Sequence, residues 1–373
     1  PTPAVAYLVR QQGFDAGAVI SASHNPYPDN GIKFFDSNGY KLPDEVEDEL
    51  EKYVRQSADN ELARPTGDGI GKIEFNSNLA HLYAHFVRHT IDTSLEGLTI
   101  VYDGANGAAS SVGPEILSGL GAKVININVN PDGLNINHHC GSTHIEGLQV
   151  AVQQHNADLG IANDGDADRC LLVDEKGQVL DGDQIMLLCA LKLKEEGKLK
   201  GDTIVGTVMS NIGFHKAAEE LGMKTVSTAV GDRYVLEYMR EHNLSIGGEQ
   251  SGHVIFLDHN TTGDGMLTAV QVAALMKEKN QPLSELAGIM TKYPQVLLNV
   301  RVATKTGWED NDLIKAAIVT AEGELGDEGR VLVRASGTEP LIRVMAEGPN
   351  QEELQSLCQE IADIIGREQG LAE

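Results

Sequence analysis

The amino-acid sequence predicts a multi-domain α/β protein, and three observations support this fold class. The chain has 373 residues, and at about 150 residues per domain this length suggests two to four domains, each with its own core. An apolar strand at 98–103, a glycine-rich loop, a helix and a second strand at 122–129 form a βαβ pattern, which predicts a parallel sheet. Linker-like stretches at 64–69 and near 292–294 divide the chain further.

The composition is that of an ordinary globular protein with an excess of acidic residues. Hydrophobic residues make up 41% of the chain and charged residues 23%. No apolar run reaches the roughly 18 residues that a membrane span needs, and no signal peptide opens the chain, so we expect a soluble, cytoplasmic protein without a membrane partner. The net charge of −26 argues against a nucleic-acid partner and requires any phosphate site to be a local cluster of cations.

The cysteines give no sign of a metal site or a redox pair. They lie far apart in the sequence and fit a reducing compartment. The four are Cys140, Cys170, Cys189 and Cys358.

The first unit is expected over residues 1–72. A helix is predicted at 4–13, and an acidic amphipathic helix at 43–55 whose charged side is most simply a solvated face. Between them, Asp36-Ser37-Asn38-Gly39 is a strong turn signal. The linker-like segment at 64–69 marks the end of this unit.

A polar loop in this unit is the first candidate for chemistry. The apolar run 18–20 predicts a buried strand that ends at Ser21-Ala22-Ser23-His24-Asn25-Pro26. A second apolar stretch, 32–35, carries Lys33. A hydroxyl beside an imidazole, with a lysine ten residues further on, suits a nucleophile or a phosphate carrier. A Ser–His pair in a polar loop is also typical of an ordinary turn.

The second unit is expected over residues 73–178, beginning with a helix near 79–90. The loop at 104–109 could suggest a dinucleotide site, but it lacks the G-x-G-x-x-G spacing and is better interpreted as a tight strand-to-helix turn. The sequence His138-His139-Cys140 resembles a set of metal ligands, yet no partner lies at helical spacing, so we interpret it as a loop.

Three alternate carboxylates near the end of this unit predict a metal site. In a looped backbone Asp164, Asp166 and Asp168 can converge on one hard cation that prefers oxygen ligands. An EF-hand also has Asp at positions 1, 3 and 5, and Glu175 even falls at position 12. However, Arg169 stands at position 6, where an EF-hand needs glycine, and the flanking segments are strand-like. A Mg²⁺ site on a strand-to-strand loop is the better interpretation.

The third unit is expected over residues 179–291, with a helix at 184–196, a strand at 203–208 and a turn at 231–234 that enters another helix. A short strand at 245–247 then delivers three polar residues at alternate positions, which would project together and suit hydrogen bonding to vicinal sugar hydroxyls or an amine. They are Glu249, Ser251 and His253. A satisfied polar turn is the alternative.

The fourth unit, residues 292–373, is a smaller α/β unit. The predicted strands and helices are 296–302, 310–322, 330–334, 341–347 and a final helix from 351. Its polar loop is Arg334-Ala335-Ser336-Gly337-Thr338-Glu339-Pro340. Hydroxyls, a glycine that exposes backbone N–H groups, and Arg343 beside Arg334 would form an anion site. A hairpin turn is the alternative.

In this order and at this spacing, the four polar loops resemble those of the α-D-phosphohexomutase family. The resemblance runs from Pro1 to about residue 350. Gly231-Asp232-Arg233-Tyr234 and Glu249-Gln250-Ser251 look most like the bacterial phosphoglucosamine branch. The resemblance implies an isomerase with three related α/β domains of mixed sheets, the first one incomplete, a smaller C-terminal α+β domain, and an active site in the central cleft.

The resemblance also implies a role for each candidate residue. Ser23 would be the phosphorylated serine and would bind one Mg²⁺ together with Asp164, Asp166 and Asp168. His24, Lys33 and Arg169 match positive catalytic positions, and Lys33 and His253 are favoured for general acid–base work. The implied substrate-binding residues are Asp232, Arg233, Glu249, Ser251, His253, Arg334, Ser336, Gly337, Thr338 and Arg343.

The implied reaction interconverts glucosamine 6-phosphate and glucosamine 1-phosphate, with glucosamine 1,6-bisphosphate as intermediate and activator, on the route to UDP-N-acetylglucosamine. Glu249 could pair with the substrate's 2-ammonium group. A homodimer is compatible with the sequence. The alternatives are a phosphomannomutase or phosphoglucomutase of the same family, or a non-catalytic phosphosugar-binding paralogue.

One departure from the family pattern lies at the N-terminus. Family members have about half a domain, including a phosphate-contacting loop, before the position of Pro1. The hypothesis is therefore that this chain by itself is inactive or partly unfolded.

Overall fold

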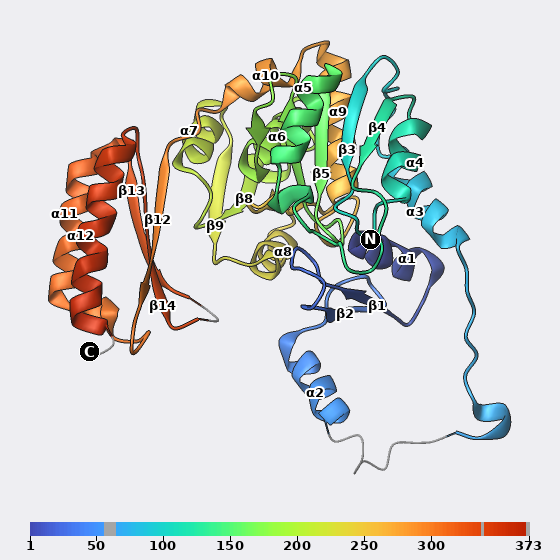
Figure 1. Cartoon of the computed structure of the whole chain (residues 1–373), viewed down its shortest axis with the longest axis horizontal. Helices are drawn as coiled ribbons and strands as arrows, with labels where there is room; N and C mark the ends of the chain where they lie inside the picture. The colour runs from blue at the N-terminus through green and yellow to red at the C-terminus, as the bar shows by residue number, and fades with distance from the viewer. Residues whose placement is uncertain (56–64, 337–338, 371–373) are drawn as a thin grey trace. The chain divides into compact units, whose positions relative to one another are not determined.

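The computed structural model describes residues 1–55, 65–336 and 339–370. It divides into two compact units, one made of residues 1–209 and 223–289 and the other of residues 210–222 and 290–373. Figure 1 shows the elements of both. No helix in these described ranges has the length and apolarity needed to cross a lipid bilayer.

The N-terminal segment is a small α/β piece of the first unit. Its elements are α1 (Thr2–Gln12), β1 (Ala16–Ser21), β2 (Gly31–Asp36), α2 (Asp44–Arg55) and a 3-10 turn η1 (Gly67–Gly69). Strands β1 and β2 pair in antiparallel fashion, with Ser21 opposite Gly31 and Val19 opposite Lys33. Lys33 is thus the third residue of the strand that follows the loop carrying Ser23.

The prediction of a buried strand at 18–20 is wrong in one respect. The strand forms, but Ile20 is 76% exposed and Ile32, its partner on β2, is 58% exposed. The two strands form a sheet of their own, so one face of it is left uncovered by the described chain. The predicted acidic helix is confirmed as α2, and none of its residues is buried.

The second sheet has five strands in the order β4-β3-β5-β6-β7. Their bounds are β3 (Thr99–Asp103), β4 (Lys123–Ile127), β5 (Leu159–Asn163), β6 (Cys170–Asp174) and β7 (Val179–Leu180). The accompanying helices are α3 (Asn78–Arg88), α4 (Val112–Gly119), α5 (Glu146–His155) and the 3-10 turn η2 (Gly141–Thr143). Because β3 runs parallel to β4 and β5 while β6 is antiparallel to β5, the βαβ prediction is confirmed within a mixed sheet.

The third sheet has four strands in the order β11-β10-β8-β9. The strands are β8 (Thr203–Thr207), β9 (Lys224–Thr228), β10 (Ile246–Gly248) and β11 (Val254–Phe256). Its helices and turns are α6 (Gly182–Glu195), η3 (Lys200–Asp202), α8 (Asp232–Glu241), α9 (Gly265–Lys279), α10 (Leu283–Leu286) and η4 (Ala287–Ile289). Helix α9 also packs on β5 and β6, which joins the second and third sheets into one unit.

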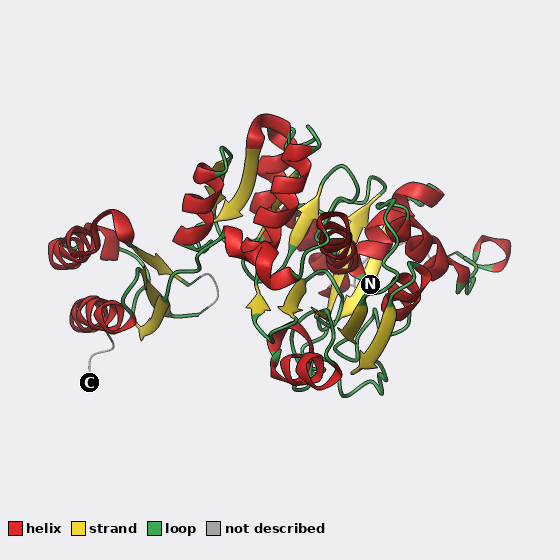
Figure 2. Cartoon of the chain, turned by 90° about the horizontal axis from the view of Figure 1, so that it is seen from above, coloured by secondary structure: helices red, strands yellow, loops and turns green. Residues whose placement is uncertain are grey.

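The second unit is built on a three-stranded antiparallel sheet in the order β12-β14-β13. Its elements are α7 (Ile212–Glu220), β12 (Gln295–Arg301), η5 (Trp308–Asp310), α11 (Asp312–Leu325), η6 (Gly326–Glu328), β13 (Arg330–Ala335), β14 (Leu341–Glu347) and α12 (Gln351–Gln369). Figure 2 shows α11 and α12 together on one face of this sheet, where Ile342 and Val344 form part of the core. Buried Glu347 accepts hydrogen bonds from Ile212 N–H at 2.9 Å and from Arg330 at 2.7 Å, which attaches the start of α7 to the sheet.

Candidate active site

Ser23 lies in the loop that joins β1 to β2. Its backbone φ is 53°, a left-handed conformation that is uncommon for a residue with a side chain. The side-chain amide of buried Asn137 donates to the carbonyl oxygens of Ser23 and Asn25 at 2.8 and 2.7 Å. Ser23 Oγ is 3.5 Å from His24 Nδ1 and 3.5 Å from Lys33 Nζ. Asn137 thus fixes the Ser23 loop from a distant part of the chain. The Ser23 hydroxyl faces the nitrogen atoms of His24 and Lys33.

The three carboxylates lie in the loop between the antiparallel strands β5 and β6. Asp164, Asp166 and Asp168 are 0%, 0% and 4% exposed, and one oxygen from each lies within 4.8 Å of the others. A Cβ atom at Gly165 would lie 2.5 Å from the carbonyl oxygen of Ser23, so glycine is what allows the two loops to approach this closely. The predicted metal loop therefore contacts the predicted phosphoserine loop.

One oxygen of each carboxylate has no hydrogen-bond partner within the described ranges. These buried atoms are Asp164 Oδ2, Asp166 Oδ1 and Asp168 Oδ1, the last of which lies 3.6 Å from His253 Nδ1, beyond hydrogen-bond distance. Burial raises the pKa of Asp164, and the charges of Asp168 and Asp166 raise it further. Unpartnered buried carboxylate oxygens are unfavourable unless a cation satisfies them. The residues present therefore fit a hard divalent cation such as Mg²⁺.

The other oxygens of Asp166 and Asp168 are held by two residues from the N-terminal segment. Asp166 Oδ2 accepts hydrogen bonds from Thr2 Oγ1 at 2.5 Å and from Lys33 Nζ at 2.6 Å. Lys33 also donates to Asp168 Oδ2 at 3.3 Å. Burial lowers the pKa of Lys33, but Asp168 and Asp166 outweigh this effect and raise it. Lys33 is therefore a cation shared between the carboxylates and Ser23 Oγ.

His24 and Arg169 are the other two nitrogen-bearing side chains of this cluster. Burial lowers the pKa of His24, and the nearby Arg169 lowers it further. As the pH falls below neutrality, the imidazole of His24 therefore stays uncharged to a lower pH than a free histidine does. The backbone N–H of Arg169 donates to Asp164 Oδ1 at 3.1 Å, and its buried Nε has no partner in the part of the chain that the structure describes.

The predicted sugar-binding residues lie in the connection between β10 and β11. Glu249 N–H donates to the carbonyl of His253 at 2.9 Å, and Gly252 N–H donates to the carbonyl of Glu249 at 3.0 Å. The segment is therefore a closed turn and not a continuation of the strand, and its role in sugar binding stays a prediction. Cys170 N–H donates to the carbonyl of Gly252 at 2.9 Å, which fixes the turn beside the carboxylate loop. The buried Ser251 Oγ has no partner among the residues described.

His253 connects this turn to the carboxylates. Its ring is 3% exposed, and Nε2 accepts a hydrogen bond from Gly263 N–H at 3.0 Å. Nδ1 is 3.6 Å from Asp168 Oδ1, and Nε2 is 3.6 Å from Asp232 Oδ2. Burial lowers the pKa of His253, but Asp168 and Asp232 outweigh this and raise it. The ring thus lies between an acidic group on each side.

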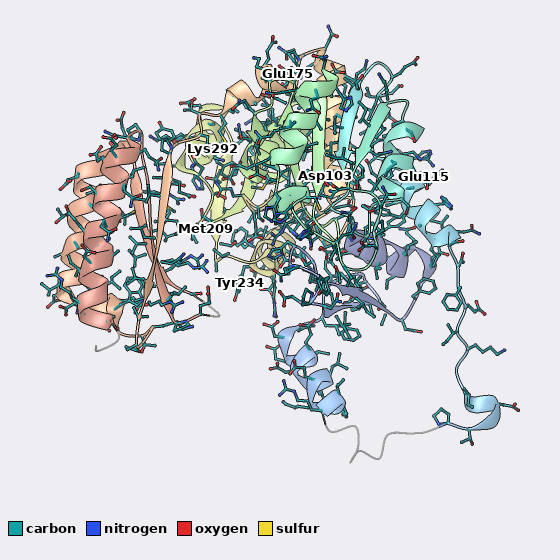
Figure 3. The ribbon with its side chains drawn as sticks, viewed as in Figure 1. Asp103, Glu115, Glu175, Met209, Tyr234 and Lys292 are labelled. Atoms are coloured by element: carbon teal, nitrogen blue, oxygen red, sulfur yellow. The ribbon has the colours of Figure 1, made fainter. Side chains whose placement is uncertain are left out.

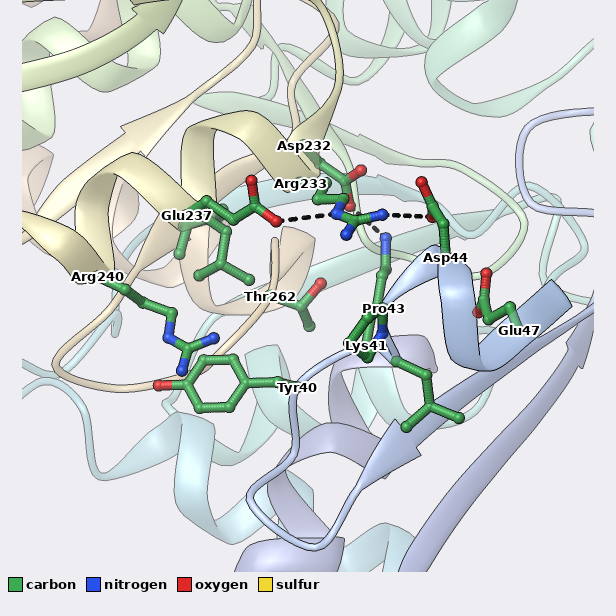
Figure 4. Close-up of a pocket in the computed structure, with 13 residues that line it drawn as sticks. Tyr40, Lys41, Pro43, Asp44, Glu47, Asp232, Arg233, Glu237, Arg240 and Thr262 are labelled. Carbon is green, nitrogen blue, oxygen red and sulfur yellow. Dashed lines mark hydrogen bonds and ion pairs between the residues drawn. The ribbon is translucent and has the colours of Figure 1, made fainter. Parts of the chain in front are cut away.

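Two further predicted substrate-binding residues, Asp232 and Arg233, begin α8. In the structure both are engaged with protein groups: Asp232 forms an ion pair with Lys41, and Arg233 forms ion pairs with Asp44 and with Glu237, the latter at 2.9 Å (Figure 4). Their assignment to substrate binding stays a prediction, and the Lys41 contact suggests another role for Asp232.

The predicted phosphate loop belongs to the second unit. Arg334 on β13 lies directly opposite Arg343 on β14, and burial together with the charge of Arg343 lowers the pKa of Arg334. Lys305, which the sequence did not single out, donates to the carbonyl of Ser336 at 2.8 Å. Three cationic side chains therefore meet around the start of this loop. Two predicted loop residues lie outside the described ranges, Gly337 and Thr338.

Models of one enzyme family match the chain in four consecutive ranges. The α/β/α domains I, II and III of phosphoglucomutase/phosphomannomutase match residues 1–61, 79–177 and 181–293, and the C-terminal domain of that family matches residues 297–364. The chain belongs to the phosphoglucomutase/phosphomannomutase family. The predicted family, the α/β fold class and the enzyme class, a phosphohexomutase isomerase, are thereby confirmed. The domain boundaries predicted at 72, 178 and 291 stay predictions.

Highly similar relatives within this family are phosphoglucosamine mutases. The protein of Desulforamulus reducens is 54% identical over 366 residues, which cover 98% of this chain and 82% of the relative. The protein of Symbiobacterium thermophilum is 55% identical over 369 residues with the same coverage. That of Geobacillus thermodenitrificans is 51% identical over 370 residues, covering 99% of this chain and 82% of the relative.

Solved structures of this mutase family share the fold at much lower identity. A phosphoglucomutase/phosphomannomutase family protein from Burkholderia thailandensis has a TM-score of 0.78 at 22% identity, covering 98% of this chain and 81% of the other. N-acetylphosphoglucosamine mutase from Aspergillus fumigatus, in complex with GlcNAc-6P and magnesium, has a TM-score of 0.73 at 20% identity, covering 98% and 92%. These likenesses support the fold.

Several supporting residues of this mutase site were missed from the sequence. Thr2 and Asn137 each make hydrogen bonds to predicted site residues more than 100 positions away. Asp103, which Figure 3 labels, is fully buried and accepts a hydrogen bond from Ala105 N–H at 2.9 Å. Ala105 in turn accepts one from Asn137 N–H at 2.9 Å. The only local sequence signal for these supporting hydrogen bonds is an aspartate at the end of a strand, followed by a glycine-rich turn.

Proposed function

We propose that this chain is a phosphoglucosamine mutase that interconverts glucosamine 6-phosphate and glucosamine 1-phosphate through a phosphoserine at Ser23 and glucosamine 1,6-bisphosphate. The observation that carries the proposal is the cluster in which Lys33 lies between Ser23 Oγ and two of the three buried carboxylates, Asp166 and Asp168. Relatives that are 51–55% identical and named phosphoglucosamine mutase support the amino sugar as substrate.

The three unpartnered oxygens of Asp164, Asp166 and Asp168 would hold one Mg²⁺, with an oxygen of the Ser23 phosphate as a further ligand. When bound, the ion neutralises part of the charge on the phosphoryl group during in-line transfer. Without a cation, a phosphate at Ser23 would repel three nearby carboxylates. The chain's own contribution is to place these oxygens beside the Ser23 loop through the close contact at Gly165.

In the first transfer, the bond between phosphorus and Ser23 Oγ breaks and a bond from phosphorus to the sugar hydroxyl oxygen forms. The Ser23 oxygen leaves with a negative charge and gains a proton, and the sugar hydroxyl gives its proton to a base, the role that we assign to His253 of the favoured acid–base pair. Lys33 carries a proton 3.5 Å from Ser23 Oγ, so it is placed to supply the proton to the leaving oxygen. The second transfer, from the turned bisphosphate back to Ser23, reverses these roles.

Substrate groups remote from the reaction would be held by the other two loops. Glu249 would accept the 2-ammonium group of the sugar, and the unpartnered hydroxyl of Ser251 would bind a neighbouring hydroxyl. Arg334 and Arg343, with Ser336 and the predicted residues Gly337 and Thr338, would bind the phosphate that does not react. A distal phosphate site is what a mutase needs and a simple phosphatase does not.

Three accompanying expectations belong to the same proposal. They are activation by glucosamine 1,6-bisphosphate, a cytoplasmic location and assembly as a homodimer, and each stays a prediction.

The substrate can be tested with the Ser23-phosphorylated chain in a single-turnover experiment. We expect glucosamine 6-phosphate to remove the phosphate at least on the order of tenfold faster than glucose 6-phosphate or mannose 6-phosphate, because Glu249 gains a charged partner only from the amino sugar. A Ser23→Ala variant should accept no phosphate, while Ser21→Ala, which removes the hydroxyl at the end of β1 that accepts a hydrogen bond from Ser23 N–H at 2.9 Å, should still be phosphorylated. Faster transfer to glucose or mannose phosphate would instead identify a phosphoglucomutase or phosphomannomutase.

A further inference from the structure

The segment that follows β2 is bound to helix α8 through three charged contacts. Arg240 lies over the ring of Tyr40, with 3.9 Å from its guanidinium carbon to the ring centre. Lys41 pairs with Asp232, and Asp44 pairs with Arg233. Figure 4 shows these pairs around a pocket of about 230 Å³, with the segment on one side and α8 on the other. Lys41, Asp44, Asp232 and Arg233 are therefore each engaged in an ion pair across this pocket.

The Lys41–Asp232 pair differs from the other two because Asp232 also lies 3.6 Å from His253, in the predicted sugar-binding turn. Asp232 is the first residue of α8, where a carboxylate is favoured by the exposed N–H groups of the first turn. The residue before it, Gly231, donates its N–H to Glu249 Oε1 at 3.1 Å. Gly231 has a φ of 133°, which a residue with a side chain rarely adopts. The backbone on one side of Asp232 therefore orients Glu249.

Lys41 also compensates for an unfavourable electrostatic arrangement. Burial and repulsion from Asp168 disfavour the Asp232 carboxylate, and two cationic groups offset this: His253, which lies 3.6 Å from each of the two aspartates, and Lys41. The Lys41 and Asp232 side chains are only 28% and 29% exposed, so solvent screens the repulsion less than it would on an open surface. Without the Lys41 cation, His253 alone offsets this repulsion, and the start of α8 loses one of the two charged contacts that hold Asp232.

We propose that Lys41 is a positioning residue for substrate selection: it holds Asp232 at the start of α8, so that the N–H of Gly231 keeps the Glu249 carboxylate directed at the amino group of the sugar. The inference rests on the proposed function, because it concerns how Glu249 recognises that amino group. It also changes the role predicted for Asp232, from a residue that contacts substrate to one that acts through its neighbours.

The test measures binding, so it does not depend on turnover by this chain. Dissociation constants for glucosamine 6-phosphate and glucose 6-phosphate are measured by calorimetry in Mg²⁺, for the wild type and for Lys41→Met. We expect Lys41→Met to weaken binding of glucosamine 6-phosphate on the order of tenfold and to change binding of glucose 6-phosphate less than about threefold. Lys41→Arg should recover most of the loss, because it restores the positive charge.

Two further variants separate positioning from a general loss of structure. Arg240→Met removes another contact between the same segment and α8, and we expect it to leave the ratio of the two dissociation constants unchanged. In Glu249→Gln, which lacks the carboxylate, the added Lys41→Met change should weaken glucosamine 6-phosphate binding no further. Equal weakening for both sugars, a similar effect of Arg240→Met, or additive losses in the double variant would overturn the inference. If the wild type binds neither phosphosugar, or binds both equally well, the proposed function itself fails.

Discussion

At the residue scale, the two oxygens of the Asp166 carboxylate have different surroundings. One oxygen, Oδ2, is held by Thr2 and Lys33, while the other, Oδ1, is buried without a partner among the described residues. A carboxylate fixed on one side presents its other oxygen in a constant direction, which is the geometry that a bound cation needs. Thr2 contributes twice, since its backbone N–H also donates to the carbonyl of Asp166 at 2.9 Å.

This arrangement predicts the effect of removing the Thr2 hydroxyl. Thr2→Val keeps the shape of the side chain but loses the hydrogen bond, so we expect the affinity for Mg²⁺ to fall about 10- to 100-fold. Titration calorimetry with Mg²⁺ measures this directly. Thr2→Ser retains the hydroxyl and should bind the ion nearly as well as the wild type. If valine and serine at this position bind Mg²⁺ equally, Thr2 does not orient Asp166.

At the scale of elements, the site consists of loops that are held against one another by hydrogen bonds to backbone carbonyls. Asn137, between β4 and α5, holds the Ser23 loop, and Cys170 at the start of β6 holds the turn that carries Glu249. None of these contacts involves a reacting group. They act by fixing the position of a loop whose own sequence is too polar and too rich in turns to hold a single conformation.

Asn137→Ala removes both hydrogen bonds to the Ser23 loop. We expect a loss of about 1–3 kcal/mol in the free energy of unfolding, together with slower phosphoryl transfer from Ser23. Urea denaturation and the single-turnover assay measure the two effects. Asn135→Ala is a matched control, because Asn135 donates within its own segment, to the carbonyl of Asn130 at 3.0 Å. If both variants slow transfer equally, Asn137 has no specific role in placing Ser23.

Helix α7 provides a prediction about pH. Burial, and then the charge of Arg330, lowers the pKa of His215 from 6.5 to about 4. The folded state therefore binds the proton less readily than the unfolded state, so the stability is complete above pH 6.5 and is lost as the pH falls from 6.5 towards 4. Compared with His215→Gln, the wild type should lose on the order of 1 kcal/mol more over this range, after allowing for solvent screening.

Urea denaturation of both proteins at several pH values measures the difference. Between pH 7 and pH 8 the two should change in parallel, which serves as the internal control. Parallel behaviour down to pH 4 as well would contradict the effect assigned to His215.

The sequence predicts the reacting residues of the site but not the residues that hold them in place. Ser23, Lys33 and the three aspartates lie in short motifs whose residue types and spacing are informative on their own. Thr2 and Asn137 could not be predicted. Thr2 acts on a residue 164 positions away and Asn137 on one 114 positions away, so their roles depend on which loops meet in the fold. Periodicity located the β1 strand but not its exposure, since burial of Ile20 depends on what covers the sheet.

At the scale of the whole molecule, a net charge of −26 has to coexist with a site for phosphorylated ligands. Cations gather locally at both predicted phosphate sites: Lys33 and Arg169 lie near Ser23 in the first unit, and Arg334, Arg343 and Lys305 lie around the loop of the second. The buried carboxylates add further negative charge to the first cluster, which a divalent ion would offset. Binding of this ion should therefore stabilise the folded protein.

Mg²⁺ is expected to stabilise the chain against unfolding by about 2.7 kcal/mol at a concentration 100 times its dissociation constant. Thermal or urea denaturation, with and without Mg²⁺ at constant ionic strength, measures the effect. Asp166→Asn should abolish it, while Asp68→Asn, at an exposed acidic residue of the linker, should leave it intact. Stabilisation that survives in Asp166→Asn would show that the ion binds elsewhere.

The central claim is that Ser23 carries the phosphoryl group, and peptide mapping by mass spectrometry tests it most directly. The chain is analysed before and after incubation with glucosamine 1,6-bisphosphate and Mg²⁺, and again after addition of glucosamine 6-phosphate. The account predicts one added phosphate on the peptide that contains Ser23, and its loss when the monophosphate is added. A phosphate on any other residue, or none on Ser23 in either this chain or a longer one that includes the family's upstream segment, would contradict the account.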